Sequence, residues 1–198
     1  MAVLSTSMGM QVLGGSGYCE DYPLEQYFRD ARIHPIHEGT TGIQALDLLG
    51  RKVMMQNGKA FSLFTEEVKN TVSDAEEYSD LKEYAAKLRD TSNRLQEVTD
   101  SLLTIAREKG PEYFLADATL YLEFFGIVSI GWQWLLKGVI AQKALQGKCS
   151  ESDQIFFSGK MATLKYFFGY EIPKTLGLAD RLLNNDGLTI EMKSDYFN

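Results

Sequence analysis

The chain has 198 residues, of which 44% are hydrophobic and 24% are charged, a composition typical of globular proteins that excludes disorder, collagen and a disulfide scaffold. Lys and Arg number 20 against 27 Asp and Glu, so the net charge is −7, and no basic run supplies the stripe that nucleic-acid phosphates require. The 4 prolines leave room for long uninterrupted helices. We therefore expect an all-α protein, an up-and-down helical bundle, with no nucleic-acid partner.

Three helices are expected near the N-terminus, over residues 1–13, 23–33 and 40–55. Glycines gather between the first two, in Gly14-Gly15-Ser16-Gly17, and such a run would be costly inside a helix. The backbone there is therefore expected to turn, or to lie close to another group. Gly58 is expected to mark the joint between an N-terminal segment, residues 1–57, and a bundle over residues 58–198.

The longest amphipathic pattern runs from Ser73 to Arg107, and Ser73 or Asp74 is expected to cap its start. Apolar and small residues recur there at alternating spacings of four and three, which predicts a seam packed against partner helices. The seam positions are Leu81, Ala85, Leu88, Ser92, Leu95, Thr99, Leu102 and Ala106. Gly110-Pro111 then breaks the helix.

The next helix is expected over residues 112–146, with Gly147 as a left-handed cap. Its most apolar part, residues 118–136, carries Glu123 and Gln133, and its charge-free stretch is shorter than the ~20 apolar residues that cross a bilayer. We expect a core helix of a soluble bundle, with no membrane span.

Two more helices are expected towards the C-terminus. Ser152 or Asp153 is expected to cap the first, which should end near Tyr170. Pro173 interrupts the helical pattern, and a short helix should follow to about Leu183. The remaining residues, 184–198, are expected to form a turn and a tail.

The cysteines and histidines show no pattern of a metal site. Cys19 and Cys149 lie far apart and belong to no CxxC or Cys/His spacing, so zinc and dithiol chemistry are not indicated. His34 and His37 could ligate a metal by their spacing, but no matched carboxylate set accompanies them, so we expect no metal. The N-terminus lacks the charged and apolar regions of a signal peptide, and we expect a cytoplasmic protein with reduced thiols.

Residues 11–53 carry three motifs in order: QVLGGSGY, a helix with the run RDARI, and EGTTGIQ. Their order and spacing closely resemble the C-terminal signature of the acyl-CoA dehydrogenases. Residues 61–190 look like the extra helical domain of the longer dehydrogenases, including those similar to 3-methylmercaptopropionyl-CoA dehydrogenase. The resemblance implies that residues 1–57 are the last helices of the acyl-CoA dehydrogenase C-terminal bundle and that residues 58–198 are the additional helical domain.

The resemblance also implies an FAD-dependent oxidation of an acyl-CoA thioester to the trans-2-enoyl-CoA. The family's α-proton-abstracting base falls on Glu38, and backbone amides at Glu38 and Gly39 would lie against the thioester. The family's flavin contacts fall on Thr40, Thr41 and Gly42 after the base, and on Gln11, Val12, Leu13, Gly14 and Gly15 at the adenine side, commonly of the neighbouring subunit's FAD. His37 stands where family members often carry Tyr, and we hypothesise that it tunes the base or the substrate pocket.

The partners implied by the resemblance are a second copy of the chain, an acyl-CoA and an electron-transfer flavoprotein. The family's N-terminal helical domain, its middle β-domain and the first helices of its C-terminal bundle have no counterpart here. We therefore expect a C-terminal portion of the enzyme that is inactive and free of FAD by itself. The alternative is a non-enzymatic helical interaction or oligomerisation module, in which Glu38 is the charge at a helix start and the glycines form turns.

Overall fold

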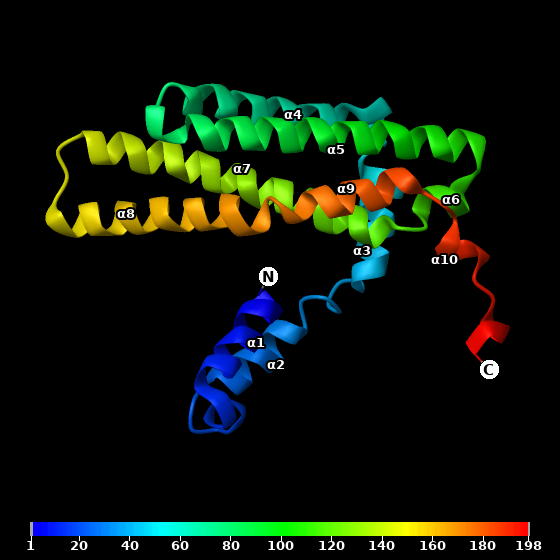
Figure 1. Ribbon diagram of the computed structural model, residues 1–198, viewed down its shortest axis with the longest axis horizontal. Coiled ribbons are helices and arrows are strands. Elements are labelled where there is room, and N and C mark those ends of the chain that lie inside the picture. The colour runs from blue at the N-terminus through cyan, green and yellow to red at the C-terminus, as the bar shows by residue number, and fades with distance from the viewer. Residues whose placement is uncertain (1, 198) are drawn as a thin grey trace. The chain divides into compact units, whose positions relative to one another are not determined.

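The structure, a computed structural model, describes residues 2–197, and every regular element in this range is helical (Figure 1). This confirms the all-α expectation. Contacts divide the chain into two compact units: an N-terminal unit up to Gln44 and a C-terminal unit from Ala45. The boundary lies inside helix α3 (Thr41–Asp47), whereas the division at residues 57 and 58 stays a prediction.

The N-terminal unit is a helical hairpin of α1 (Ala2–Leu13) and α2 (Leu24–Arg32), which lie side by side (Figure 1). A short 3-10 helix, η1 (Gly14–Tyr18), joins α1 to the turn before α2. Position 17 in η1 requires glycine, because a Cβ on Gly17 would lie 2.6 Å from the carbonyl oxygen of Met10. The expected close approach of the backbone is therefore confirmed.

The C-terminal unit continues α3 as a π-helical turn, η2 (Leu48–Lys52), and then as α4 (Met55–Glu76). Three residues near the start of α4, namely Gln56, Asn57 and Gly58, have left-handed backbone angles and interrupt the helix. The chain thus bends at Gly58, and the expected joint between two segments at this residue stays a prediction.

The chain turns near Tyr78, after the end of α4. A short 3-10 helix, η3 (Ser79–Leu81), follows the turn and leads directly into α5 (Lys82–Glu108). The expected helix start at Ser73 or Asp74 is therefore wrong. The buried residues Val72 and Ala75 extend the apolar face of α4 past this point, so core packing overrides the capping preference. The predicted seam of α5 is confirmed, because every position from Leu81 to Leu102 is buried and Ala106 is half-buried.

The single helix expected over residues 112–146 is two helices, α6 (Pro111–Leu115) and α7 (Ala118–Gln146). Asp117 leaves the helical conformation between them and forms an ion pair with Arg181 of a later helix at 3.1 Å. Gly147 has extended angles of φ −90° and ψ −172°, so the expected left-handed cap is wrong. Its N–H donates to the carbonyl of Ala144, and the chain leaves the helix in an extended conformation.

Helix α7 is long and apolar enough to cross a membrane by length and composition alone, with a mean hydropathy of 1.4 over its most apolar window. It packs against α4, α5 and the two later helices, and Tyr121, Phe124 and Leu135 are fully buried. A Cβ on Gly138 would lie 2.4 Å from a methyl carbon of Leu164. A central place in the C-terminal unit accounts for the apolar sequence.

Helix α8 covers Glu151–Tyr166 and continues as a π-helical turn, η4 (Phe167–Glu171). Its cap is Ser150, whose Oγ accepts a hydrogen bond from the Asp153 N–H at 3.2 Å, so the expected cap at Ser152 or Asp153 is wrong by two or three residues. Pro173 precedes α9 (Lys174–Asn184), as expected. Short helices, α10 (Leu188–Glu191) and η5 (Ser194–Phe197), stand where a turn and tail were expected.

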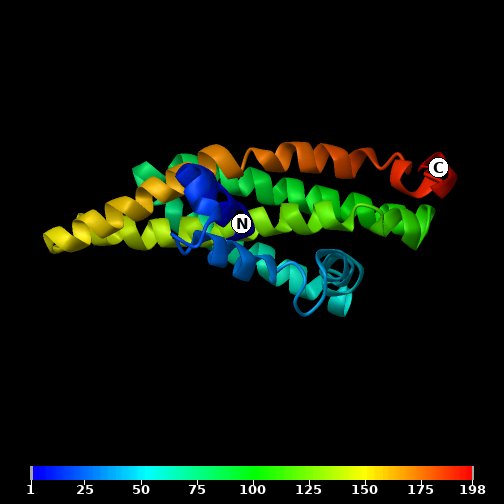
Figure 2. The ribbon, with the colours of Figure 1, turned by 90° about the horizontal axis from the view of Figure 1, so that it is seen from below.

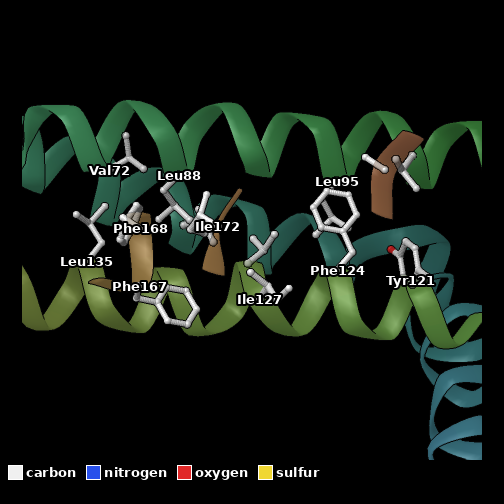
Figure 3. Packing of buried hydrophobic residues seen from close by; sticks show 14 of the residues in the cluster. Val72, Leu88, Leu95, Tyr121, Phe124, Ile127, Leu135, Phe167, Phe168 and Ile172 are labelled. Atoms are coloured by element: carbon white, nitrogen blue, oxygen red, sulfur yellow. The ribbon is translucent and has the colours of Figure 1, made fainter. Parts of the chain in front are cut away.

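Helices α4 and α5, then α7 and α8, form successive antiparallel hairpins in the C-terminal unit (Figure 1). Helix α9 packs beside α5 and α7, and Figure 2 shows this arrangement from below. The core lies between these helices, where Leu95 of α5 faces Phe124 of α7 (Figure 3). The Tyr121 hydroxyl lies 2.8 Å from Thr99 Oγ1, and burial raises the pKa of Tyr121 well above its ordinary value.

Candidate functional site

Glu38 lies in the loop between α2 and α3, in the N-terminal unit. Its backbone is left-handed, with a φ of +57°, and Gly39 follows with a φ of +114°. A non-glycine residue in this region costs on the order of 1–3 kcal/mol and persists only where neighbouring interactions fix it. Two successive residues with positive φ reverse the chain immediately before α3.

Hydrogen bonds across the loop hold this reversal. The N–H of His37 donates to the carbonyl of Ile33 at 2.8 Å, and the N–H of Thr41 donates to the carbonyl of Pro35 at 3.0 Å. The side-chain Nε2 of Gln44 donates to the carbonyl of Glu38 at 2.5 Å. Hydrogen bonds therefore link the residues before and after Glu38, and its own carbonyl, to other residues of the N-terminal unit.

The chemical groups of the turn face outward. The Glu38 side chain is exposed, and within residues 2–197 no side chain donates to its carboxylate. In the same described range, the backbone N–H groups of Glu38 and Gly39 donate no hydrogen bond. The turn thus offers a carboxylate that can accept a proton beside two free N–H donors.

Thr40, Thr41 and Gly42 continue the turn into the start of α3. The side chains of Thr40 and Thr41 are exposed, and a Cβ on Gly42 would meet nothing within 4 Å. This segment is directly continuous with Glu38, so the structure brings the base and these three predicted cofactor residues together.

The other predicted cofactor run ends α1 and begins η1. Gln11, Val12, Gly14 and Gly15 are exposed, Leu13 is half-buried, and Val12 is 85% exposed. Gly14 has a φ of +60°, and a Cβ on either glycine would meet nothing within 4 Å. An open glycine turn beside an exposed apolar side chain suits the close approach of a flat ring or a phosphate, so these residues fit the adenine side of FAD.

The two runs lie at opposite ends of α2. The glycine turn precedes this helix and the Glu38 loop follows it, and α2 has 9 residues, a length of about 14 Å. Because α1 and α2 form a hairpin, the glycine turn lies at its closed end and the Glu38 loop lies beyond its open end (Figure 1). The structure does not bring the two runs together in one chain.

His34 and His37 are exposed on the loop before Glu38. Among residues 2–197, no group of three or more His, Cys, Asp or Glu side chains is placed to hold a metal ion. Cys19 and Cys149 are free thiols.

Two features of the site were missed by the sequence reasoning. One is the left-handed Glu38–Gly39 turn, and the other is the bond from Gln44 back to Glu38. The only sequence signal for the bond from Gln44 was the final Gln of EGTTGIQ, six residues after the base.

One pKa is shifted near the site, at the end of α3. Hydrogen bonds from Arg51 and Lys52 lower the pKa of Asp47 to about 2.

Two family models match the chain. The model described as "Acyl-CoA dehydrogenase, C-terminal domain" matches residues 1–54. The model described as "Acetyl-CoA dehydrogenase C-terminal like" matches residues 64–193.

Among curated relatives, the chain is 35% identical over 173 residues to 3-methylmercaptopropionyl-CoA dehydrogenase of Ruegeria pomeroyi, covering 84% of this chain and 28% of the relative. It is 31% identical over 163 residues to the broad-specificity linear acyl-CoA dehydrogenase FadE5 of Mycobacterium tuberculosis, covering 80% of this chain and 27% of the relative. A shorter match, 49% identical over 49 residues, links 25% of this chain to 12% of the mitochondrial short-chain specific acyl-CoA dehydrogenase of Bos taurus. The chain therefore spans less than a third of the length of each of these relatives.

Proposed function

The chain belongs to the acyl-CoA dehydrogenase family, and on that premise we propose that it supplies the catalytic base and part of the flavin site of an FAD-dependent acyl-CoA dehydrogenase. The proposed reaction oxidises an acyl-CoA to the trans-2-enoyl-CoA. The observation that carries the proposal is the turn at Glu38, in which a carboxylate and two free N–H groups stand together on the family's motif.

Glu38 acts as the base in this proposal. Its carboxylate takes the α-proton of the thioester, and the electron pair of the broken C–H bond becomes the new double bond. When bound, FAD supplies the acceptor for the β-hydrogen and its two electrons. The N–H groups of Glu38 and Gly39 donate to the thioester oxygen as negative charge develops on it, which lowers the barrier to proton removal.

Thr40, Thr41 and Gly42 would hold the flavin near the base, because they follow Glu38 directly and face outward. Residues 11–15 would hold the adenine side. In the family that the motifs resemble, this run commonly contacts the FAD of the neighbouring subunit, and we extend that arrangement to this chain. Such an arrangement calls for a homo-oligomer, in which each subunit contributes residues 11–15 to its neighbour's cofactor. An acyl-CoA and an electron-transfer flavoprotein complete the proposed set of partners.

The test is a chimera that joins this chain to the part of the Ruegeria pomeroyi relative preceding the matched segment. Turnover of an acyl-CoA with an artificial electron acceptor should fall about 10³-fold in Glu38→Gln, with flavin content unchanged. Asp30→Asn, which also removes an exposed carboxylate of this unit, is the matched control and should retain full turnover. Undiminished activity of Glu38→Gln would refute the assignment of the base.

A non-enzymatic interaction module is the second candidate function. The observation that favours it is the exposed apolar surface of α1, which carries Leu4, Met8 and Val12. Exposed apolar patches mark surfaces that bind other proteins. A chimera that binds no flavin while the isolated chain self-associates in light scattering would favour this function over the first.

A further inference from the structure

We propose that Gln44 is a positioning residue that orients the Gly39 N–H and fixes the conformation of Glu38. The inference rests on the proposed function of Glu38 and adds a residue that acts through the loop backbone. Gln44 lies in the first turns of α3, is half-buried, and contacts the base through its carbonyl oxygen.

The hydrogen bond from Gln44 fixes the orientation of the peptide plane between Glu38 and Gly39. In a trans peptide the carbonyl of one residue and the N–H of the next lie in one plane and point in opposite directions. Because the Nε2 of Gln44 donates to the Glu38 carbonyl, that carbonyl points towards the Gln44 side chain. The Gly39 N–H is therefore turned to the opposite side, where it is free to donate to a thioester oxygen.

The surroundings of this bond fit such a function. Gln44 is anchored on a helix, because its own N–H donates to the carbonyl of Thr40 at 3.0 Å. A Cβ on Gly39 would lie 3.0 Å from Gln44 Nε2, so glycine leaves room for the amide. The same bond also opposes relaxation of Glu38 from its left-handed backbone, which would otherwise be favourable.

The first test uses the isolated chain and needs neither flavin nor substrate. A glutamyl endopeptidase cleaves after Glu38 only when the turn opens locally, so the rate of this cleavage, followed by mass spectrometry, reports opening. In Gln44→Ala and in the near-isosteric Gln44→Glu, which lacks the N–H donor, the rate should rise about tenfold. An unchanged rate in both variants would overturn the proposal.

The matched control is Gln96→Ala. Gln96 is also a half-buried helical Gln, and its Nε2 donates to the Asp100 carboxylate at 3.0 Å, in the C-terminal unit. Cleavage after Glu38 should be unchanged in this variant. A tenfold rise there as well would show general destabilisation and would overturn the assignment to Gln44.

The second test uses the chimera described above. Gln44→Ala should lower kcat about tenfold, with KM and flavin content within about twofold, because an oxyanion donor that is misdirected stabilises the transition state less. Full kcat in Gln44→Ala together with an inactive Glu38→Gln would overturn this inference and leave the proposed function intact. If Glu38→Gln is itself fully active, the proposed function fails, while the cleavage assay still decides whether Gln44 fixes the turn.

Discussion

The two units of this chain differ in how they are held together. In the N-terminal unit, burial among the described residues is limited to Gly17 and Ala31, and α1 has no buried residue. In the C-terminal unit, a continuous apolar core runs through α4, α5, α7, α8 and α9. The unit with the candidate site is thus shaped by local hydrogen bonds, while the unit with the core supplies most of the hydrophobic stabilisation.

This difference indicates how function and stability are divided. Isolated helices as short as α1 and α2 are marginal in water, and a hairpin that buries few side chains gains little from packing. In the proposed enzyme, the exposed apolar side chains of α1 would be covered by other parts of the protein. The candidate site would then be completed by assembly.

Amide hydrogen exchange should show the largest difference between the units. Amides of the buried seam of α5 should exchange about 10⁴-fold more slowly than helical amides of α1, because α1 opens without exposing a core. Mass spectrometry of exchanged peptides measures both in one sample. Equal protection in α1 and α5 would contradict the comparison.

A pair of truncations tests the same contrast by stability. Phe124→Ala removes a fully buried ring in α7 and should lower the free energy of unfolding by about 3–5 kcal/mol. Val12→Ala removes atoms that are already exposed and should change it by no more than about 0.5 kcal/mol. Urea unfolding followed by circular dichroism measures both, and a comparable loss in Val12→Ala would show packing that α1 lacks in the structure.

The buried hydroxyl pair gives a smaller effect. Thr99 donates to the carbonyl of Leu95 at 2.7 Å, so the Tyr121 hydroxyl is the donor to Thr99. Tyr121→Phe should lower the free energy of unfolding by about 1 kcal/mol, because one buried acceptor loses its donor. Tyr166→Phe, on the exposed face of α8, is the control and should be neutral in the same urea experiment.

The smallest effect concerns the two surface ion pairs of Asp47, with Arg51 and with Lys52, at the start of the C-terminal unit. Hydrogen bonds from Arg51 and Lys52 lower the pKa of Asp47 from 3.8 to about 2. The pKa of Asp47 is lower in the folded chain than in the unfolded chain, so its ionised carboxylate stabilises the fold above pH 3.8. This stabilisation is lost as the pH falls towards 2. An NMR titration should show the Asp47 midpoint rising in Arg51→Ala, and an unchanged midpoint would contradict the assigned cause.

The elements that sequence reasoning predicted well are those set by periodicity. The α5 seam was found because alternating spacings of four and three follow directly from helix geometry. The ends of helices were predicted poorly. Ser73 lies inside α4, because a cap contributes about 1 kcal/mol and the burial of Val72 and Ala75 outweighs it. The cap of α8 is Ser150, whose Oγ accepts the Asp153 N–H, and not the expected Ser152 or Asp153.

The candidate site also has features that the sequence predicted and features that only the structure revealed. Glu38, Gly39 and the two cofactor runs were reached through motifs, and their assigned functions stay predictions. The left-handed turn at Glu38 had no counterpart in residue pattern or propensity, and the only sequence signal for the bond from Gln44 was the final Gln of EGTTGIQ. A glutamate disfavours this backbone, so only the geometry of the closed loop reveals it.

By itself, the sequence determined the family, the all-helical class and the residues that form the apolar seam, because these depend on motifs and on spacing along the chain. Only the tertiary structure decided where the helices end, which unit holds the core, and which way the Gly39 N–H points. Those features depend on which side chains meet across the fold. Gln44 and Glu38 meet only after the loop between them has closed.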